Sequence, residues 1–492
     1  MPARPSPRTT RVLQRLGGGG YDDPLLSLGV CDIAGTGVPL PPVPCLPAFA
    51  APGAPRMQGV PVRSDEKEVR VTQMAEPRTS ADRSAQLRAA LVDTLRDKGM
   101  VTSALVEAAV RVVPRERFIP AGTPLEVAYA YDSSVVTKRD QHGVAISSVS
   151  AAFIQTRMLE LAELRPGMTV LEVGSGGLNA AMIAEIVGPQ GRVVSVDIDP
   201  EVTHRAAALL DETGYGSRVR VLVADAEHGV PDEGPFDAII VTVGAWDIAP
   251  AWLDQLAPDG VLVLPLIMNG VTRTIGFRRD GDHLASTSAE VAGFVPMQGA
   301  GSHADQVLEL TDTTGGKVKL SLDSGAPPDL IQLNGVLNAD TAEFWSGVTV
   351  SHGTSFADLH LWLAWHLDGF CRLSADEGSA LAAQKRWLPF AVVREAGLAY
   401  LVLRDALQGA GAEFGARAYG RDGQVAAAAL IEQIQAWDRA GRGVPPTFAY
   451  WPAGSHRSQI PADATVMTKT HGAVTISWPT SNGASPKPAS LG

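Results

Sequence analysis

The hydrophobic residues in the first half of the chain predict two helices. Three leucines recur at every fourth position within 84–98, so they share one face of a helix. A second helix is predicted over 105–112, because Ser103 can cap its first turn and Pro114 follows its end. Ordered structure is therefore expected to begin near residue 84.

From residue 169 onward, short β-branched runs alternate with helical segments. The predicted strands are 169–173, 192–197, 219–223, 238–243 and 261–266, and the predicted helices are 180–187, 201–213 and 252–256. Two further runs flank Asp280-Gly281, a strong turn signal for an antiparallel hairpin. This order predicts an α/β fold: a doubly wound, Rossmann-like sheet with a mainly parallel core and an antiparallel edge hairpin.

The rest of the chain divides by composition into a second domain and two tails. Residues 304–478 predict a separate C-terminal mixed α/β domain. Its predicted strands are 307–310, 317–322 and 473–478, and its predicted helices are 356–367 and 424–439. Residues 1–57 hold 11 Pro and 8 Gly, a composition typical of disorder. The predicted boundaries are a tail at 1–83, a first domain at 84–303 with a helical part at 84–165, the second domain at 304–478, and a tail at 479–492.

Composition and charge exclude several classes of protein. The formal charge is -12 and no run of Lys and Arg forms a basic stripe, which argues against a nucleic-acid partner. No uncharged apolar stretch reaches the roughly 18 residues of a membrane span. Three cysteines cannot build a disulfide framework, so a cytoplasmic location is expected. No metal site is predicted, because His360 and His366 fall on opposite faces of their helix.

A glycine-rich turn follows the first predicted strand of the doubly wound sheet. Glu172 closes that strand, and Gly174, Ser175 and Gly176 lead into the next helix. Glycine lets the backbone turn sharply and lets a ligand approach closely, while the helix N-terminus offers free amides. The dinucleotide fingerprint requires a third glycine where this chain has Asn179, and no P-loop lysine follows. The turn therefore favours a ligand without a diphosphate.

Two more carboxylates close the next two predicted strands. Asp197 can accept hydrogen bonds from the two hydroxyls of a ribose, and Asp225 can accept a hydrogen bond from the amino group of an adenine. Because the carboxyl ends of parallel strands meet at one edge of the sheet, these groups are expected to gather there with Glu172. A ligand with ribose and adenine but no diphosphate fits S-adenosylmethionine, which is therefore the predicted cofactor.

These motifs resemble the protein-L-isoaspartate O-methyltransferase family. The similarity covers roughly 84–300 and includes the segments 106–120, 145–149, 171–176, 235–242 and 255–265. It implies that Ser147 is the catalytic serine, whose hydroxyl orients the substrate carboxylate. It also implies that the cofactor is contacted by Ile146, Glu172, Gly174, Ser175, Gly176, Asp197, Ile198, Asp225, Ala226, Thr242 and Gln298. His303 is a second candidate beside Gln298.

Departures from the family pattern point to a specialised branch. The usual proline of the serine segment is Val149 here, and the runs 241–250 and 293–299 resemble the isoaspartyl-type methyltransferases of the FxLD system, which accompany lanthipeptide precursors. That branch also carries an additional C-terminal domain. The resemblance implies a modified lanthipeptide precursor as the peptide partner. Trp246 and Asp247 follow the fourth strand, where they are expected to shape the substrate entrance.

The implied reaction is methyl transfer to an Asp or isoAsp carboxylate, which is already ionised at neutral pH and needs no strong base. The ester can then close to a succinimide, which either remains or hydrolyses to isoaspartate. Two alternatives stay open: a general repair enzyme for isoaspartate in aged proteins, and a cofactor-binding scaffold without catalysis. An amino-methyltransferase of nucleic acids is disfavoured, because 243–246 lacks the Asn/Asp-Pro-Pro-aromatic turn of that chemistry.

Overall fold

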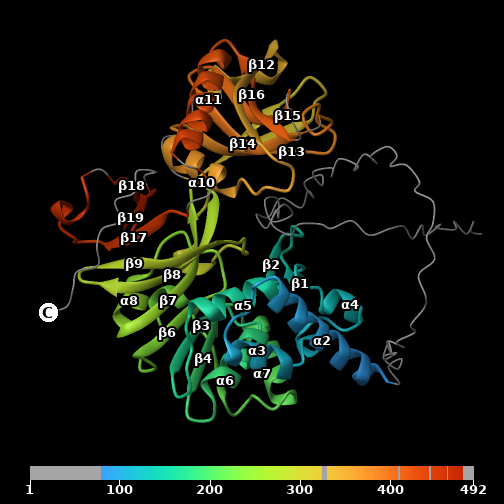
Figure 1. Ribbon diagram of the computed structural model, residues 1–492, viewed down its shortest axis with the longest axis vertical. Helices are drawn as coiled ribbons and strands as arrows, with labels where there is room; N and C mark the ends of the chain where they lie inside the picture. Colours follow the sequence, from blue (N-terminus) through green and yellow to red (C-terminus); the bar gives the residue numbers. More distant parts are fainter. Residues whose placement is uncertain are drawn as a thin grey trace, which may run out of the picture.

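The computed structural model describes residues 79–323, 330–384, 386–407, 411–440, 442, 445–462 and 464–479. The tails predicted at the two ends lie outside these residues, apart from 79–83 and 479. In Figure 1 a large sheet with helices against it fills the lower part of the molecule, and a second sheet lies above it. No helix among the described residues has the length and apolar character needed to cross a membrane.

The two helices predicted near the N-terminus are confirmed. The first, α2 (Ser80–Asp97), begins where Thr79 accepts a hydrogen bond from the amide of Asp82. In the second, α3, the hydroxyl of Ser103 accepts from the amide of Leu105 at 3.3 Å. The helix α3 spans Ala104–Val112. It is followed, before the large sheet, by η2 (Arg115–Phe118), α4 (Leu125–Ala128), the antiparallel hairpin of β1 (Val135–Arg139) and β2 (Ala145–Val149), and α5 (Ala152–Leu161).

The large sheet has ten strands in the order β18-β19-β17-β9-β8-β7-β6-β3-β4-β5. Its parallel part is β3 (Thr169–Val173), β4 (Arg192–Asp197), β5 (Val219–Val223), β6 (Phe236–Val241) and β7 (Leu256–Met268). The antiparallel hairpin β8 (Val271–Asp280) and β9 (His283–Val291) extends it. The crossover elements are α6 (Leu178–Val187), α7 (Pro200–Glu212), η3 (Ala226–His228) and α8 (Pro250–Gln255). The predicted doubly wound sheet with an antiparallel edge is confirmed.

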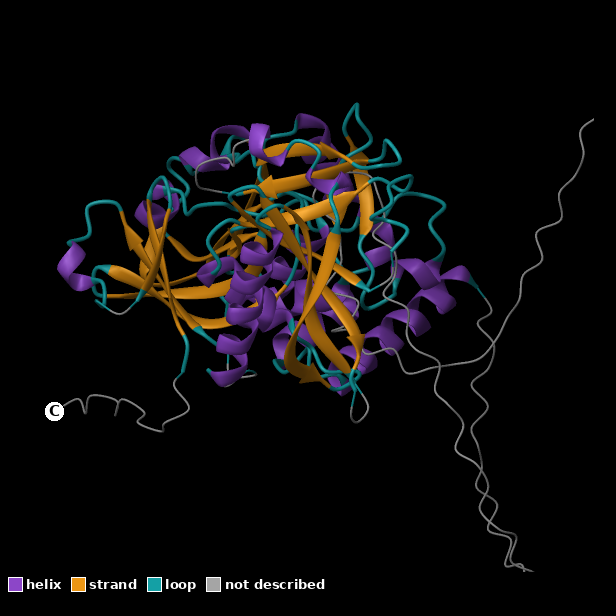
Figure 2. Ribbon diagram, turned by 90° about the horizontal axis from the view of Figure 1, so that it is seen from above, coloured by secondary structure: helices purple, strands orange, loops and turns teal. Residues whose placement is uncertain are grey.

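Both faces of the parallel strands β3, β4 and β6 are buried along most of their length, as continuous apolar runs require, whereas β5 is partly exposed. Successive side chains on a strand point to opposite faces. Accordingly, Val170 belongs to a core that includes α3, α5 and α6, whereas Leu171 belongs to a core that reaches the helices of the second sheet. Figure 2 shows one group of helices in the middle of the view with strands to its left and right, and further helices along the upper edge.

The second sheet has seven antiparallel strands in the order β10-β11-β13-β14-β15-β16-β12. Its strands are β10 (Gln306–Thr311), β11 (Lys317–Leu322), β12 (Thr341–Val350), β13 (Phe370–Ala375), β14 (Trp387–Arg394), β15 (Gly397–Asp405) and β16 (Ala412–Gly420). The short helix η4 (Gly299–Gly301) precedes this sheet in the chain. The helices that lie between or after its strands are α9 (Leu330–Leu333), η5 (Val336–Asn338), α10 (Ala357–His366) and α11 (Gly423–Arg439). The strands predicted at 307–310 and 317–322 and both long helices are confirmed as β10, β11, α10 and α11, while five strands of this sheet were not foreseen.

The last three strands do not belong to the second sheet. After α11 the chain returns to the first sheet, where Ala449 of β17 pairs with Ala285 of β9. These returning elements are β17 (Thr447–Pro452), η6 (Arg457–Gln459), β18 (Thr465–Thr468) and β19 (Gly472–Ser477). The region predicted as one unit over 304–478 is thus split between two sheets. Local patterns cannot reveal this, because strand pairing is decided between segments far apart in the chain.

Candidate active site

The glycine-rich turn after β3 adopts a backbone that only glycine accepts easily. Gly174 has φ +97°, and a Cβ there would lie 2.4 Å from Oγ1 of Thr242. The Thr242 hydroxyl lies 3.0 Å from the carbonyl oxygen of Val173 and 3.1 Å from that of Gly174, so it ties the turn to the end of β6. A Cβ on Gly176 would meet no atom within 4 Å, so this glycine borders open space.

Glu172 is fully buried beside this turn. Burial raises its pKa to about 7, although a hydrogen bond from Ser195 opposes the shift. Ser195 Oγ lies 2.5 Å from Glu172 Oε2 and 2.8 Å from Ser175 Oγ. Sequence reasoning missed Ser195, which sits in the middle of a hydrophobic strand and could have been found as a lone polar residue there.

Three buried polar atoms at this place lack a hydrogen bond of acceptable geometry within the described structure. They are Oε1 of Glu172 and both side-chain polar atoms of Asn179. These two residues, Gly174, Gly176 and Thr242 are among those that line a narrow cavity of about 30 Å³. Buried polar groups in folded proteins are normally paired. The cavity therefore suits a ligand that carries an ammonium or another polar group to Glu172 and Asn179.

The structure brings the other two predicted carboxylates to the same edge of the sheet. Asp197 accepts hydrogen bonds from the amides of Ser175 and Asp199, both at 3.0 Å. Asp225 accepts from the amides of Glu227 at 3.1 Å and Ala300 at 2.7 Å. Each carboxylate oxygen keeps a further lone pair for a ligand hydroxyl or amine.

The segment that begins at Gln298 closes over these strand ends. A Cβ on Gly299 would lie 2.3 Å from Oδ2 of Asp225 and 2.6 Å from Cδ1 of Ile198, which shows how closely the backbone approaches both. The Ala226 carbonyl oxygen accepts a hydrogen bond from Nε1 of Trp252 at 2.8 Å, so this residue is anchored to α8. The predicted cofactor residues of β4, β5 and the Gln298 segment therefore meet.

The structure distinguishes Ser147 from its neighbour. Ser147 and Ile146 are half-buried on β2, and Ser147 Oγ lies 2.8 Å from Oγ1 of Thr137 on the paired strand. Ser147 is absent from the lining of the narrow cavity, whereas Ser148 is part of it. Adjacent residues of a strand face opposite sides, which separates the two hydroxyls. The catalytic role of Ser147 stays a prediction, and Ser148 is a candidate that the sequence did not single out.

A larger cleft of about 500 Å³ adjoins the narrow cavity. Ser148, Ser150 and Phe294 line both spaces, so the two meet at the end of β2. The walls of the cleft come from the first sheet and from the second, including His360 of α10 and Arg372 of β13. Its volume lies in the range of ligand-binding sites.

Trp246 lies in this cleft, whereas Asp247 is engaged inside the protein. Asp247 accepts hydrogen bonds from the amide of Ile248 at 2.8 Å, the hydroxyl of Tyr450 at 3.0 Å and the amide of His471 at 2.6 Å. It therefore holds the returning strands against the first sheet. The contact of Trp246 with substrate stays a prediction, while the hydrogen bonds of Asp247 favour a structural role over the predicted role at the substrate entrance.

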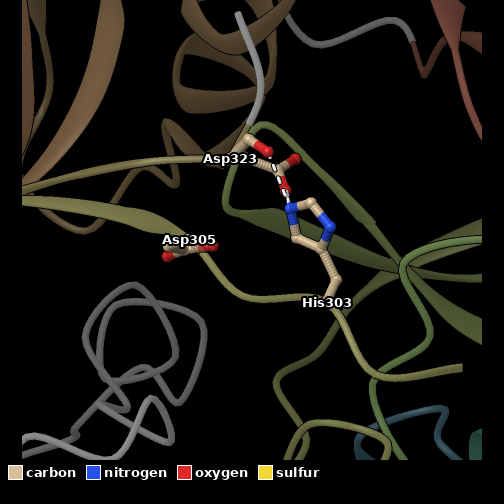
Figure 3. Close-up of side chains that lie close together, drawn as sticks. All are labelled: His303, Asp305 and Asp323. Atoms are coloured by element: carbon tan, nitrogen blue, oxygen red, sulfur yellow. Dashed lines mark hydrogen bonds and ion pairs between the residues drawn. The ribbon is translucent and has the colours of Figure 1, made fainter. Parts of the chain in front are cut away.

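His303, Asp305 and Asp323 form the one group among the described residues whose ligand atoms approach as they would around a metal ion, all within 4.8 Å of one another. Figure 3 shows the imidazole of His303 directed at Asp323. Nε2 of His303 lies 3.0 Å from Oδ1 of Asp323. Asp323 also accepts from Nε1 of Trp246 at 2.6 Å, and Asp305 pairs with Arg372 at 2.5 Å. Protein donors already satisfy much of this cluster, which favours a polar link between the two sheets over a metal site.

Raising the pH through neutrality is expected to weaken this link. The hydrogen bond to Asp323 raises the pKa of His303 above its ordinary value of 6.5. Burial by itself would raise the pKa of Asp323, but the hydrogen bond from His303 holds that pKa below its ordinary value of 3.8. The stability that His303 contributes is therefore complete below pH 6.5 and is lost as the pH rises through the raised pKa of His303. The stability that Asp323 contributes is lost only in strong acid, as the pH falls through its lowered pKa.

The measurement is the thermal unfolding midpoint from about pH 5 to about pH 9. His303→Gln should make the midpoint less dependent on pH across this range than it is in the unmodified chain. His142→Gln, at an exposed histidine of the β1–β2 turn, is the matched control and should leave the dependence unchanged. An unaltered dependence in His303→Gln would disprove the role of this pair.

A glycine turn and three acidic strand ends at the carboxyl edge of a doubly wound sheet, beside a cavity with unpaired polar atoms, define an S-adenosylmethionine-dependent methyltransferase. The comparisons with known proteins agree. The family model for protein-L-isoaspartate(D-aspartate) O-methyltransferase (PCMT) matches residues 86–302. The chain belongs to this family and is a carboxyl methyltransferase.

Two sequence relatives support this assignment over most of their own length. The chain is 41% identical over 180 residues to a protein-L-isoaspartate O-methyltransferase of Methanopyrus kandleri, covering 36% of this chain and 76% of the relative. It is 35% identical over 209 residues to that of Pyrobaculum neutrophilum, covering 42% and 97%. A solved protein-L-isoaspartate O-methyltransferase aligns at 22% identity with a TM-score of 0.40, covering 51% of this chain and 92% of that one. The strands β10 to β19 lie beyond the match to the family model.

Proposed function

We propose that this enzyme methylates the carboxylate of an Asp or isoAsp residue in a ribosomally made, lanthipeptide-type precursor of the FxLD system. The observation that carries the proposal is the junction of the two cavities at Ser148, Ser150 and Phe294. A cofactor held at Glu172, Asp197 and Asp225 and a peptide in the larger cleft would meet at this junction.

The protein's own groups have a modest task in such a transfer. S-adenosylmethionine supplies an electrophilic methyl group, and the carboxylate is already the competent nucleophile at neutral pH. The enzyme must hold the two aligned and keep water away. Ser148 and Ser150 are placed to donate a hydrogen bond to the carboxylate oxygen that does not react, with Ser147 as the alternative that the family resemblance implies. Phe294 contributes an apolar wall.

The methyl ester then reacts within the peptide. The nitrogen of the following backbone amide attacks the ester carbonyl, an N–C bond forms, and the C–O bond to the methoxy group breaks. The amide proton leaves with that group as methanol, and a succinimide remains. Hydrolysis of the succinimide gives Asp or isoAsp. This sequence requires no further cofactor.

A specialised peptide is favoured by the origin of the cleft walls. His360, Arg372 and Phe390 line the cleft and lie outside the segment matched by the family model. A substrate in this cleft would therefore contact parts that the matched relatives do not share with this chain. General repair of isoaspartate in proteins is the second candidate, because the match over 86–302 to enzymes named for that substrate supports it equally.

The deciding experiment compares three substrates with purified full-length enzyme and S-adenosylmethionine. They are a lanthipeptide-type precursor of the FxLD system with its thioether rings closed, the same precursor without rings, and a generic linear isoAsp peptide. Mass spectrometry should find a gain of one methylene unit, and later the loss of one water relative to the start, for the cyclised precursor alone. Equal methylation of the generic peptide would instead establish the repair function.

A further inference from the structure

Arg273 of β8 is a buried cation without an ion-pair partner among the described residues. It is 5% exposed and lines the large cleft. Its guanidinium donates to the carbonyl oxygens of Thr272 at 3.0 Å and Ala357 at 2.7 Å. Burial lowers its pKa to about 10, and Asp358 opposes that shift through its charge without forming an ion pair. Arg273 is therefore still charged at neutral pH, and a buried charge without a partner is costly.

His360 of α10 offers a second unsatisfied group on the same cleft. It is 6% exposed, and its Nε2 has no hydrogen-bond partner. The ring packs against Phe390 with centroids 4.0 Å apart and against the edge of Phe356 at 5.3 Å. Burial lowers its pKa to about 3, so the imidazole remains neutral and can donate a hydrogen bond from Nε2 in one tautomer.

Arg372 of β13 completes the wall. It is the cross-strand partner of Phe390, whose ring contacts His360. One terminal nitrogen pairs with Asp305 at 2.5 Å, while its buried Nε has no hydrogen-bond partner. A Cβ on Gly270 would lie 2.5 Å from that Nε, so the guanidinium reaches the turn that leads to β8 and Arg273.

We propose that Arg273, His360 and Arg372 form an anion subsite that binds a second carboxylate of the peptide substrate, apart from the carboxylate that is methylated. The acidic residues that line the cleft form no ion pair with Arg273: Asp305 pairs with Arg372, and Asp132 belongs to the segment just before the β1–β2 hairpin. Asp358, which does not line the cleft, acts on Arg273 through its charge but forms no ion pair with it, so the guanidinium is still without a paired anion. The carboxylate is either an Asp or Glu side chain or the C-terminus of the peptide.

This inference rests on the proposed peptide methylation, and the experiment separates the two. Four peptides share one methylatable isoAsp: a neighbouring Glu or Gln is combined with a free or an amidated C-terminus. If no peptide is methylated although calorimetry shows cofactor binding, the proposed function fails. If all four are methylated with equal kcat/KM, the anion subsite fails.

The expected result is at least a tenfold higher kcat/KM for peptides with the second carboxylate, expressed through KM. The Glu and Gln pair identifies a side-chain source, and the free and amidated pair identifies the C-terminus. Arg372→Gln and Arg273→Met should each abolish the preference and leave cofactor affinity unchanged. Arg394→Gln is the matched control, since Arg394 also has an unpartnered buried Nε but lies outside the cleft, and it should keep the preference. Retention of the preference in Arg372→Gln and Arg273→Met would overturn the proposal.

Discussion

Gly174→Ala is expected to lose cofactor binding and activity together. The backbone of Gly174, at φ +97°, is strained for any residue with a side chain, and the new Cβ would lie 2.4 Å from Oγ1 of Thr242. Relief of that overlap must move Thr242 away from the carbonyl oxygens of Val173 and Gly174 or reshape the turn. The left-handed conformation alone costs about 1–2 kcal/mol. Titration calorimetry with S-adenosylmethionine should show an affinity at least about tenfold lower, which corresponds to about 1.4 kcal/mol.

Gly176→Ala provides the matched control for the strain. A Cβ at Gly176 meets no atom within 4 Å, so the thermal midpoint should equal that of the unmodified chain. The same Cβ projects beside the narrow cavity, so cofactor affinity should still fall. Gly174→Ala should lower both the midpoint and the affinity. Unchanged affinity in both variants would mean that the glycine turn does not hold the cofactor.

Arg115→Met is expected to produce the largest loss of stability. Arg115 is 5% exposed, and its guanidinium donates to the carbonyl oxygens of Ala128 and Ser150, both at 2.7 Å, and to Gln155 Oε1 at 2.5 Å. Methionine would leave three acceptors unpaired, at a cost of about 1–3 kcal/mol for each buried group, less than additive in sum. A total of about 3–5 kcal/mol is therefore expected in urea unfolding. Since Ser150 borders both cavities, kcat should fall as well.

Arg117→Met tests the same chemistry two positions away. Arg117 is 54% exposed and pairs with an equally exposed Glu212 at 3.1 Å. Exposed ion pairs contribute about 0–1 kcal/mol, so this variant should unfold close to the unmodified chain. Arg115→Lys should recover only part of the loss, because an ammonium cannot reproduce the planar fork of a guanidinium. Equal unfolding free energies for Arg115→Met and Arg117→Met would refute the role of Arg115.

The first sheet and its cofactor edge could be predicted because they depend on local signals. The strand runs, the turn at Gly174 and the carboxylates at strand ends lie in single segments, and parallel topology places their ends together. Arg115 escaped notice because its importance comes from burial and from partners distant in the chain, whereas Ser195 did carry a local signal as a lone polar residue within a hydrophobic strand. Asp247 was predicted at the substrate entrance, but its carboxylate accepts hydrogen bonds from Tyr450 and His471, which lie more than 200 residues away in the chain and which local patterns do not reveal.

The second sheet was harder to predict for a related reason. Its central strands β14 and β15 are buried along most of their length and carry no alternation of polar and apolar residues. Continuous apolar runs of this kind do not distinguish a strand from a helix. The return of β17 to β9 is likewise invisible locally, because the partner lies more than 150 residues away in sequence, as the pairing of Ala449 with Ala285 shows.

The return of β17–β19 has a consequence for how the chain can be cut. The seven-stranded sheet is an insertion with both its entry and its exit on the same host sheet. A single nick inside the insertion would therefore leave two fragments that remain joined through the pairing of β9 with β17. Excision from 304 to 446 with a bridging linker is thus the way to keep all ten strands of the host sheet, whereas a stop codon after 303 would remove the three edge strands β17, β18 and β19.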